Sequence, residues 1–449
     1  MDRFTRTADI IKAYYSYKQT ADSATFVKKV CSFFDFIKDE SLSDADLNLL
    51  LFLANEAGIP QYYDLLKSKF TNAEIGDESI NSLTMSALFH DASLIRGDSK
   101  LHRYQKHVLD SFVATQRNRY VLTAPTSFGK TFLVYEIIQK MQYQNVLLIF
   151  PAISLLSENY ARLCSWEAFS DYAIHSLSEE EFDITQKNIF IFTPERFLSF
   201  MDSHQHLHFN FAFIDEVYKI DNSFVIDQET SGENERDTAY RLALEFICNL
   251  TDNMLLAGPY MALPTAETEL HKSFNDFARD NGFVFLRYNQ FEIVSKEYTT
   301  VKSRQQYIID NIPVEIGSAS KTQKIANIIL ALSSPTENTI IYCNRKSDTE
   351  SYARQLLNNQ ELISIFQERC SAVDAPVYEI FLEHLQNTFG DDWIVLKALK
   401  GRIGIHHSLV PKYIQKEIIS LFNCGALICL CSTTTITEGV ITSAKNIII

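Results

Sequence analysis

From residue 101 onward, short unbroken apolar segments alternate with helical patterns. The segments lie at Tyr120–Thr123, Val146–Phe150, Ile189–Phe192, Phe211–Ile214 and Met254–Leu256, and turn or polar residues close them. Strands that are apolar at every position are buried on both faces, which is typical of a parallel sheet covered by helices. The alternation therefore predicts an α/β fold.

The alternation restarts after a less regular stretch at about 291–320, which predicts a second α/β lobe. Its predicted strands are Thr339–Tyr342, Ile403–Ile405, Ala426–Cys431 and Asn446–Ile449, with helices at Asp348–Leu357 and Lys412–Phe422. Residues 1–97 instead carry apolar side chains at helical spacing, such as Phe26, Val30 and Phe33. We therefore expect a helical accessory domain at 1–97, a first lobe at 98–296 and a second lobe at 297–449.

Composition excludes several classes of protein. With 13 Gly, 10 Pro and 46% apolar residues among 449, the chain is neither collagen-like nor disordered. No apolar run approaches the roughly 18 residues that a membrane span needs. The eight Cys form no CxxC pair, so we expect a cytoplasmic protein with reduced thiols and no membrane partner. A net charge of −15 opposes histone-like adsorption to DNA, although helix N-termini still bind phosphate locally.

A phosphate-binding loop follows the first predicted strand of the first lobe. Its residues are Ala124, Pro125, Thr126, Ser127, Phe128, Gly129, Lys130 and Thr131, directly before a helical pattern at Phe132–Met141. In such a loop the backbone N–H groups cradle the phosphates of ATP, Lys130 neutralises the β- and γ-phosphates, and the Thr131 hydroxyl reaches Mg²⁺. We expect Lys130 to face solvent and phosphate. The alternative is an ordinary turn with an exposed lysine.

An acidic pair completes the predicted nucleotide site. Asp215 and Glu216 follow the strand Phe211–Ile214 directly, at the end where open α/β sheets bind ligands. We expect Asp215 to hold Mg²⁺ and Glu216 to orient or deprotonate the attacking water. Two carboxylates at a strand end are more often simply solvated, and the phosphate loop 85 positions earlier argues against that alternative.

These residues resemble motifs I and II of the superfamily 2 helicases, the DEAD/DExH-box enzymes. Phe150-Pro151-Ala152 resembles motif Ia, and Thr193-Pro194-Glu195-Arg196 resembles motif Ib. The resemblance implies two RecA-like lobes, ATP and Mg²⁺ as ligands, and strand contacts at Pro151, Ala152, Thr193, Pro194 and Arg196. It also implies adenine recognition by Gln105, which lies 25 residues before Lys130, although a lone Gln on a helix is more often solvated.

The second lobe carries further matches in the order that the family shows. Ile340–Arg345 resembles motif IV and Thr433–Val440 resembles motif V, while His406-His407 points to the Ski-like subset. The resemblance implies nucleotide contacts at Glu438 and Gly439, and strand contacts at Asn344, Arg345 and Thr433. The expected nucleic-acid partner is a single strand, or a duplex with a single-stranded tail.

Several positions depart from the family pattern. Tyr218 replaces the expected His of motif II, Ala257-Gly258-Pro259 replaces Ser-Ala-Thr in motif III, and Ile441 and Ser443 replace Asn and Pro in motif V. Motif VI should lie beyond Ile449, so we expect the natural gene to continue past this residue. On that expectation the 449-residue chain binds ATP but hydrolyses it slowly, because a missing arginine finger supplies on the order of 10³ to 10⁵ in rate.

Two functions fit this pattern. The first is an ATP-dependent helicase or translocase, for which bacterial defence is a pathway suggested by analogy. The second is an ATP-responsive nucleic-acid-binding scaffold or sensor with weak or no motor activity. A protein partner of the N-terminal helical domain is a further expectation. Elsewhere, Ser178-Glu-Glu-Glu181 matches a capping box and predicts the start of a helix.

Overall fold

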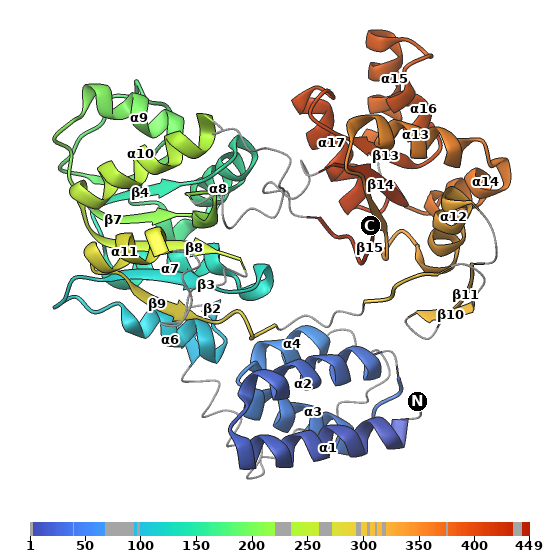
Figure 1. Cartoon of the computed structure of the whole chain (residues 1–449), viewed down its shortest axis with the longest axis horizontal. Coiled ribbons are helices and arrows are strands. Elements are labelled where there is room, and N and C mark those ends of the chain that lie inside the picture. The colour runs from blue at the N-terminus through green and yellow to red at the C-terminus, as the bar shows by residue number, and fades with distance from the viewer. Residues whose placement is uncertain are drawn as a thin grey trace. The chain divides into compact units, whose positions relative to one another are not determined.

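The computed structural model describes residues 3–38, 40–67, 94–96, 99–220, 235–259, 272–292, 298–302, 306–309, 312–316, 320–373, 376–433 and 442–449. The chain divides into two compact units, Met1–Lys296 and Glu297–Ile449 (Figure 1). Helices of the first unit are α1 (Arg3–Thr20), α2 (Ser23–Ile37), α3 (Asp44–Ala57), α4 (Pro60–Lys67), α6 (Arg103–Ser111), α7 (Lys130–Met141), α8 (Ile153–Ser165), α9 (Pro194–Ser203), α10 (Glu235–Leu250) and α11 (Lys272–Asp280).

A parallel sheet of seven strands forms the centre of the first unit. Its strands are β3 (Arg119–Thr123), β4 (Asn145–Ile149), β5 (Tyr172–His175), β6 (Lys187–Phe192), β7 (Phe209–Ile214), β8 (Thr251–Gly258) and β9 (Val284–Arg287). They lie in the order β5-β6-β4-β7-β8-β3-β9, and every registered pair is parallel. A short antiparallel pair, β1 (Ile95–Arg96) with β2 (Ser99–Lys100), precedes the sheet.

Helices cover both faces of this sheet, which explains why its strands are apolar throughout. Side chains of α9, α10 and α11 pack on one face around Val121, Leu147 and Phe190. Side chains of α6, α7 and α8 pack on the other face around Leu122 and Leu148. Side chains at neighbouring positions of one strand thus pack against helices on opposite faces of the sheet. The predicted α/β architecture is confirmed.

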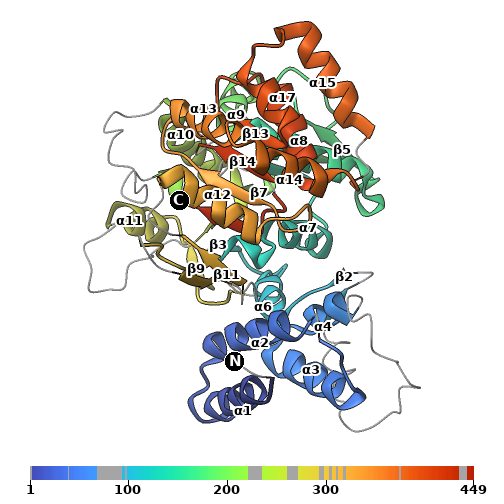
Figure 2. The same ribbon diagram turned by 90° about the vertical axis from the view of Figure 1, so that its right-hand side faces the viewer.

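Buried side chains of the N-terminal helices α1–α4 belong to the same core as those of α6 and α7. Figure 2 shows α2 and α4 next to α6. Ser43 begins α3 with a capping box, because its side chain accepts from the Asp46 amide and the Asp46 carboxylate accepts from the Ser43 amide. Gly58 ends α3 in the left-handed region at φ 74°, which Gly adopts at low cost. The chain thereby turns sharply into α4, and this α3–α4 corner (residues 54–60) packs beside α6.

The second unit holds a smaller parallel sheet. Its strands β12 (Thr339–Tyr342), β13 (Ile403–His406), β14 (Cys429–Ser432) and β15 (Asn446–Ile448) lie in the order β13-β14-β12-β15. Its helices are α12 (Lys321–Leu332), α13 (Lys346–Leu357), α14 (Gln360–Cys370), α15 (Pro376–Phe389), α16 (Ile394–Lys400) and α17 (Lys412–Asn423). A hairpin of β10 (Gln306–Ile309) and β11 (Ile312–Glu315) precedes α12. The second α/β lobe is therefore confirmed, whereas α12 and α14–α16 were not predicted.

The helix predicted to start at Ser178 is wrong. Residues 178–183 form a turn and irregular backbone, and the Asp183 carboxylate accepts hydrogen bonds from the amide and the hydroxyl of Thr185. This local turn competes with a helix for the same backbone groups. Among the described residues, no helix is both long and apolar enough to span a bilayer.

Candidate functional site

The phosphate loop connects β3 to α7 at the carboxyl edge of the first sheet. Thr126–Phe128 form a single 3₁₀ turn, and Gly129 then adopts φ 75°, ψ 38° directly before α7 begins. The left-handed conformation favours glycine, and a Cβ at position 129 would lie 2.7 Å from Nε2 of Gln105 and displace that amide. No side chain caps the start of α7, so its first amides remain available to an anion.

Lys130 lies at the predicted junction but does not face solvent. Its side chain is buried, and Nζ donates to the carbonyls of Ala124 and Pro125 at 3.0 Å each. Burial lowers the pKa of Lys130, and the charges of Asp215 and Glu216 oppose that shift. The expected exposure is therefore wrong, because carbonyls of the loop itself bind the ammonium group. This electrostatic interaction and the strand order β7-β8-β3 place the loop and the acidic pair at one edge of the sheet.

The acidic pair lies at the end of β7. The Asp215 amide donates to the Ile149 carbonyl at 3.0 Å, and the Tyr240 hydroxyl donates to the Asp215 carbonyl at 3.0 Å. These bonds fix the backbone on both sides of Asp215. Glu216 follows at φ 49°, a left-handed conformation that is uncommon for a residue with a Cβ, and its amide donates to Oδ1 of Asp215 at 3.0 Å. Local strain therefore coincides with the predicted catalytic carboxylate.

Strand β8 lies between the loop strand β3 and the acidic strand β7, and it ends in the unusual motif III. Ala257 is fully buried, and the Gly258 carbonyl accepts a hydrogen bond from the Ala124 amide at 3.3 Å. Neither Ala257 nor Pro259 has a side-chain hydroxyl. The contact from this motif to the phosphate loop is therefore made by the backbone.

Gln105 is not the solvated residue that a lone helical Gln usually is. Its Oε1 accepts from the His102 amide at 3.1 Å, and its Nε2 donates to the Phe128 carbonyl at 2.9 Å. His102 was not singled out in the sequence, yet it caps α6 and its ring Nε2 lies 3.3 Å from the same carbonyl. The spacing His-x-x-Gln before a helix is the signal that could have identified this capping box.

The strand-binding candidates of the first unit lie at its carboxyl edge. Pro151 and Ala152 follow β4, whereas Thr193, Pro194 and Arg196 follow β6, which pairs with β4. Thr193 is buried, and its hydroxyl accepts from the Arg196 amide to cap α9. The Arg196 guanidinium donates to the Ser176 carbonyl at 3.1 Å. The structure thus brings these residues together and gives Thr193 a structural task as well.

The candidates of the second unit also share one sheet edge. Asn344 and Arg345 are exposed and follow β12, and Thr433 follows the adjacent strand β14. The Thr433 amide donates to the His406 carbonyl at 3.3 Å, and burial lowers the pKa of His406 to about 4. Glu438 and Gly439 lie outside the described residues.

The described residues of the first unit fit a nucleotide with Mg²⁺. A left-handed glycine, an uncapped helix start and a buried lysine surround one loop, as phosphate binding requires. Asp215 supplies the hard oxygen ligand that Mg²⁺ prefers, and Thr131 at the first turn of α7 supplies a hydroxyl.

Comparisons with known proteins agree with this geometry. Residues 98–249 match the family described as Type III restriction enzyme, res subunit, and this range includes the loop and the acidic pair. An Escherichia coli (strain K12) protein named Anti-bacteriophage protein B is 24% identical over 388 residues, which cover 86% of this chain and 46% of that protein. A Drosophila melanogaster protein named Helicase POLQ-like is 21% identical over 377 residues, 79% of this chain and 34% of that protein.

These matches support a superfamily 2 helicase family. The chain spans less than half the length of both relatives. The matched range 98–249 contains β3, α7 and β7, the elements that position Lys130 and Asp215.

Proposed function

We propose that this chain is the ATP-dependent motor region of a superfamily 2 helicase or translocase, of the Ski-like subset. The observation that carries the proposal is that the loop with Lys130 and the pair Asp215 and Glu216 lie at the same carboxyl edge of one parallel sheet and interact electrostatically. A nucleotide site of this kind recurs where a phosphate loop and a strand-end carboxylate face one another.

Phosphate binding, Mg²⁺ binding and proton acceptance fall to different groups of the site. Amides at the start of α7 bind the phosphates, and Lys130 exchanges the Ala124 and Pro125 carbonyls for phosphate oxygens. Thr131 and Asp215 would hold Mg²⁺, which when bound neutralises charge on the β- and γ-phosphates. Glu216 accepts a proton from water as the water oxygen attacks the γ-phosphorus and the bond to the β–γ bridging oxygen breaks.

Strand binding is proposed at the two carboxyl edges. Ala152 precedes helix α8 as its N-cap residue and provides no side-chain hydrogen bond, so the first amides of α8 suit a phosphate of the strand. Exposed Asn344 and Arg345 offer polar and cationic groups on the second unit. Contacts of this kind hold the backbone without reading bases, so affinity should fall as salt rises and depend weakly on sequence. Strong base preference with no salt dependence would contradict this assignment.

The deciding experiment compares Lys130→Ala with Lys187→Ala in the product of the complete gene. Lys187 starts β6 at the opposite edge of the same sheet and pairs with Asp171 at 2.7 Å. Fluorescent nucleotide binding and nucleic-acid-stimulated ATP hydrolysis are measured for each variant. Only Lys130→Ala should lose both, with its circular dichroism unchanged. Wild-type activity in Lys130→Ala would remove the basis of the proposal.

An ATP-responsive scaffold or sensor is the second candidate function. The lack of side-chain hydroxyls in Ala257-Gly258-Pro259 favours it. A motor needs this motif to relay nucleotide state, whereas a scaffold needs only ATP binding. If nucleic acid binds tightly but leaves ATP hydrolysis at its basal rate, the scaffold is the better description. Stimulation of hydrolysis by single strands would support the motor.

A role in defence against bacteriophage is proposed from the named E. coli relative. Phage plating on cells that express the complete gene tests it, with Glu216→Gln as the matched inactive variant. Protection that is lost with Glu216→Gln would support an ATP-driven defence role. Equal plating with and without the gene would contradict it.

A further inference from the structure

The first turn of α6 contacts three separate parts of the first unit. His102 and Gln105 bind the phosphate loop, Arg103 binds the α3–α4 corner, and Tyr104 contacts both that corner and Phe291. Because these residues are consecutive in one helical turn, a displacement of one contact displaces the others. The nucleotide chemistry of the proposed function uses none of these contacts.

On the loop side, two donors converge on one peptide oxygen. Nδ1 of His102 accepts from the Gln105 amide at 3.1 Å, so the ring proton lies on Nε2, which faces the Phe128 carbonyl at 3.3 Å. Nε2 of Gln105 donates to that carbonyl at 2.9 Å. The Phe128 peptide leads directly into left-handed Gly129. The position of α6 therefore sets the conformation of the loop that receives phosphate.

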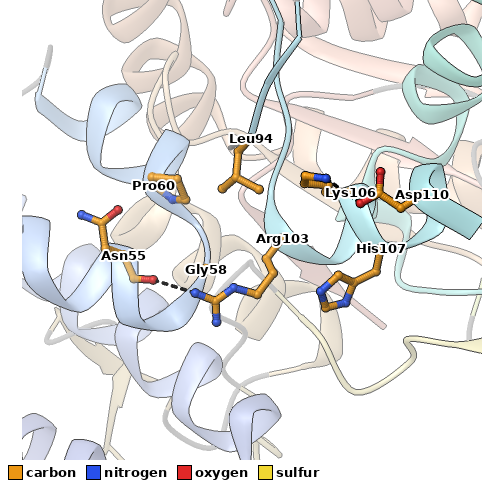
Figure 3. A pocket seen from close by; sticks show the side chains of 8 residues that line it. All are labelled: Asn55, Gly58, Pro60, Leu94, Arg103, Lys106, His107 and Asp110. Atoms are coloured by element: carbon orange, nitrogen blue, oxygen red, sulfur yellow. Dashed lines mark hydrogen bonds and ion pairs between the residues drawn. The ribbon is translucent and has the colours of Figure 1, made fainter. Parts of the chain in front are cut away.

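On the opposite side, α6 is bonded to the helical N-terminal segment. The Arg103 amide donates to the Gly58 carbonyl at 3.0 Å, and its guanidinium reaches the Asn55 carbonyl at 3.2 Å (Figure 3). The Tyr104 hydroxyl donates to the Ala57 carbonyl at 3.3 Å. Beside these bonds lies a pocket of about 260 Å³, lined by residues of the corner and of α6 together with Leu94. Directional bonds therefore add to the shared hydrophobic core of the corner and α6, and they link the position of the corner to that of α6.

A third contact joins α6 to the chain segment that leaves the first unit. The rings of Tyr104 and Phe291 lie 3.9 Å apart, and Tyr288 lies 5.4 Å from the Phe128 ring. The Tyr288 amide also donates to the Thr123 carbonyl at 2.8 Å, at the end of the loop strand. The aromatic contacts thus fix residues 288–291 to the same junction.

We propose that the first turn of α6 couples docking of the N-terminal helices to nucleotide binding at the phosphate loop. This coupling rests on the proposed function, because it assumes that the loop binds ATP. Linkage is reciprocal, so nucleotide must strengthen docking of the α3–α4 corner by the same factor by which docking strengthens nucleotide binding. A partner protein that binds α1–α4 would then change the affinity for ATP without contacting the nucleotide site.

The test uses the full 449-residue chain with a fluorescent ADP analogue. Arg103→Ala should weaken nucleotide affinity by about fivefold, the lower end of ordinary allosteric coupling. Lys106→Ala is the matched control, since Lys106 lies on the same helix and pairs with Asp110 one turn further along. Its affinity should equal that of the wild type.

Hydrogen exchange of the wild-type chain gives an independent measurement, which decides the matter should Arg103→Ala fold poorly. Nucleotide should slow hydrogen exchange at the backbone amides of residues 54–59 and leave that of α17, in the other unit, unchanged. Tight nucleotide binding with unaltered exchange at residues 54–59 would overturn the coupling alone. A wild-type chain that binds no nucleotide would overturn the proposed function, and the coupling with it.

Discussion

The two edges of the seven-stranded sheet are built from different chemistry. At the carboxyl edge, a buried Lys130 lies near two carboxylates, and Glu216 holds a left-handed backbone. At the amino edge, neutral amides connect neighbouring strands through Asn118, Asn145, Asn188, Asn210 and Asn253.

The amino-edge asparagines form an almost continuous ladder. Nδ2 of Asn118 donates to Oδ1 of Asn253 at 3.0 Å, and Nδ2 of Asn253 donates to the Asn210 carbonyl at 3.0 Å. The Asn145 amide donates to Oδ1 of Asn210 at 2.8 Å, and Nδ2 of Asn188 donates to Oδ1 of Asn145 at 3.0 Å. Such bonds fix the alignment of the strands, so the opposite edge can hold buried charge and strain.

The largest effect should follow removal of the catalytic charge. Glu216→Gln should retain ATP binding but slow hydrolysis on the order of 10²- to 10⁴-fold, because only the proton acceptor is lost. Asn188→Ala, at the other edge, should leave turnover per folded molecule unchanged. Single-turnover hydrolysis and nucleotide titration measure the two quantities separately. Loss of ATP binding in Glu216→Gln would show that the carboxylate acts in binding instead.

The amino edge should show the converse behaviour. Asn188 is 1% exposed, and its side chain bonds with His175, Asn145 and backbone carbonyls. Asn188→Ala leaves several buried groups without partners, so the free energy of unfolding should fall by about 2 to 3 kcal/mol. Urea unfolding measures this, with exposed Asn249→Ala on α10 as the control. Equal stability of the two variants would show that the ladder contributes nothing.

The same contrast separates what the sequence predicts well from what it does not. The strand before the loop and the strand before Asp215 are recognisable, because unbroken apolar runs report burial on both faces. Their order in the sheet and the electrostatic interaction between Lys130 and the acidic pair depend on long-range strand pairing, which local sequence patterns do not contain. The burial of Lys130 was missed for that reason, since its partners are carbonyls whose direction only the folded loop defines.

Other misses arose from incomplete use of local signals. Helix α14 places Leu362, Phe366 and Cys370 on one buried face at a spacing of four, a detectable pattern. The amino-edge asparagines are less accessible to prediction, because each appears as an ordinary polar residue before a strand. Only the parallel register aligns them. The false helix at Ser178 shows that a capping box has little value without a continuing apolar face.

Low pH should reduce the free energy of unfolding through His102, which lies against the phosphate loop. Burial lowers the pKa of this ring to about 4, below the ordinary 6.5, so the unfolded chain binds the proton first as pH falls. The neutral ring therefore contributes its full stability above pH 6.5, and the contribution declines between pH 6.5 and 4. At pH 5 the loss should be about 2 kcal/mol.

The variant His102→Asn isolates this effect, because Asn also caps helices but does not titrate. The drop in unfolding free energy between pH 7 and pH 5 should be smaller in the variant by about 2 kcal/mol. The variant must be compared with the wild type, because burial also lowers the pKa of His406 to about 4 in the second unit. His406 therefore contributes to the pH dependence of both proteins. Identical pH profiles would show that His102 is as exposed to protons in the folded chain as in the unfolded one.

The smallest effect concerns the strain at Glu216. A left-handed residue with a Cβ costs roughly 1–2 kcal/mol, whereas Gly pays about 0.5–1 kcal/mol in chain entropy. Glu216→Gly should therefore raise the unfolding free energy by up to about 1 kcal/mol, while Glu216→Gln keeps the Cβ and gains nothing from the backbone. Both variants should be equally slow in hydrolysis. If Glu216→Gly has a higher unfolding free energy but no ATP hydrolysis, the carboxyl edge of the sheet is less stable than it could be because catalysis requires Glu216. The asparagine ladder at the amino edge, by contrast, contributes to stability. A less stable Glu216→Gly would instead mean that contacts of the Glu216 side chain outweigh the strain in its backbone.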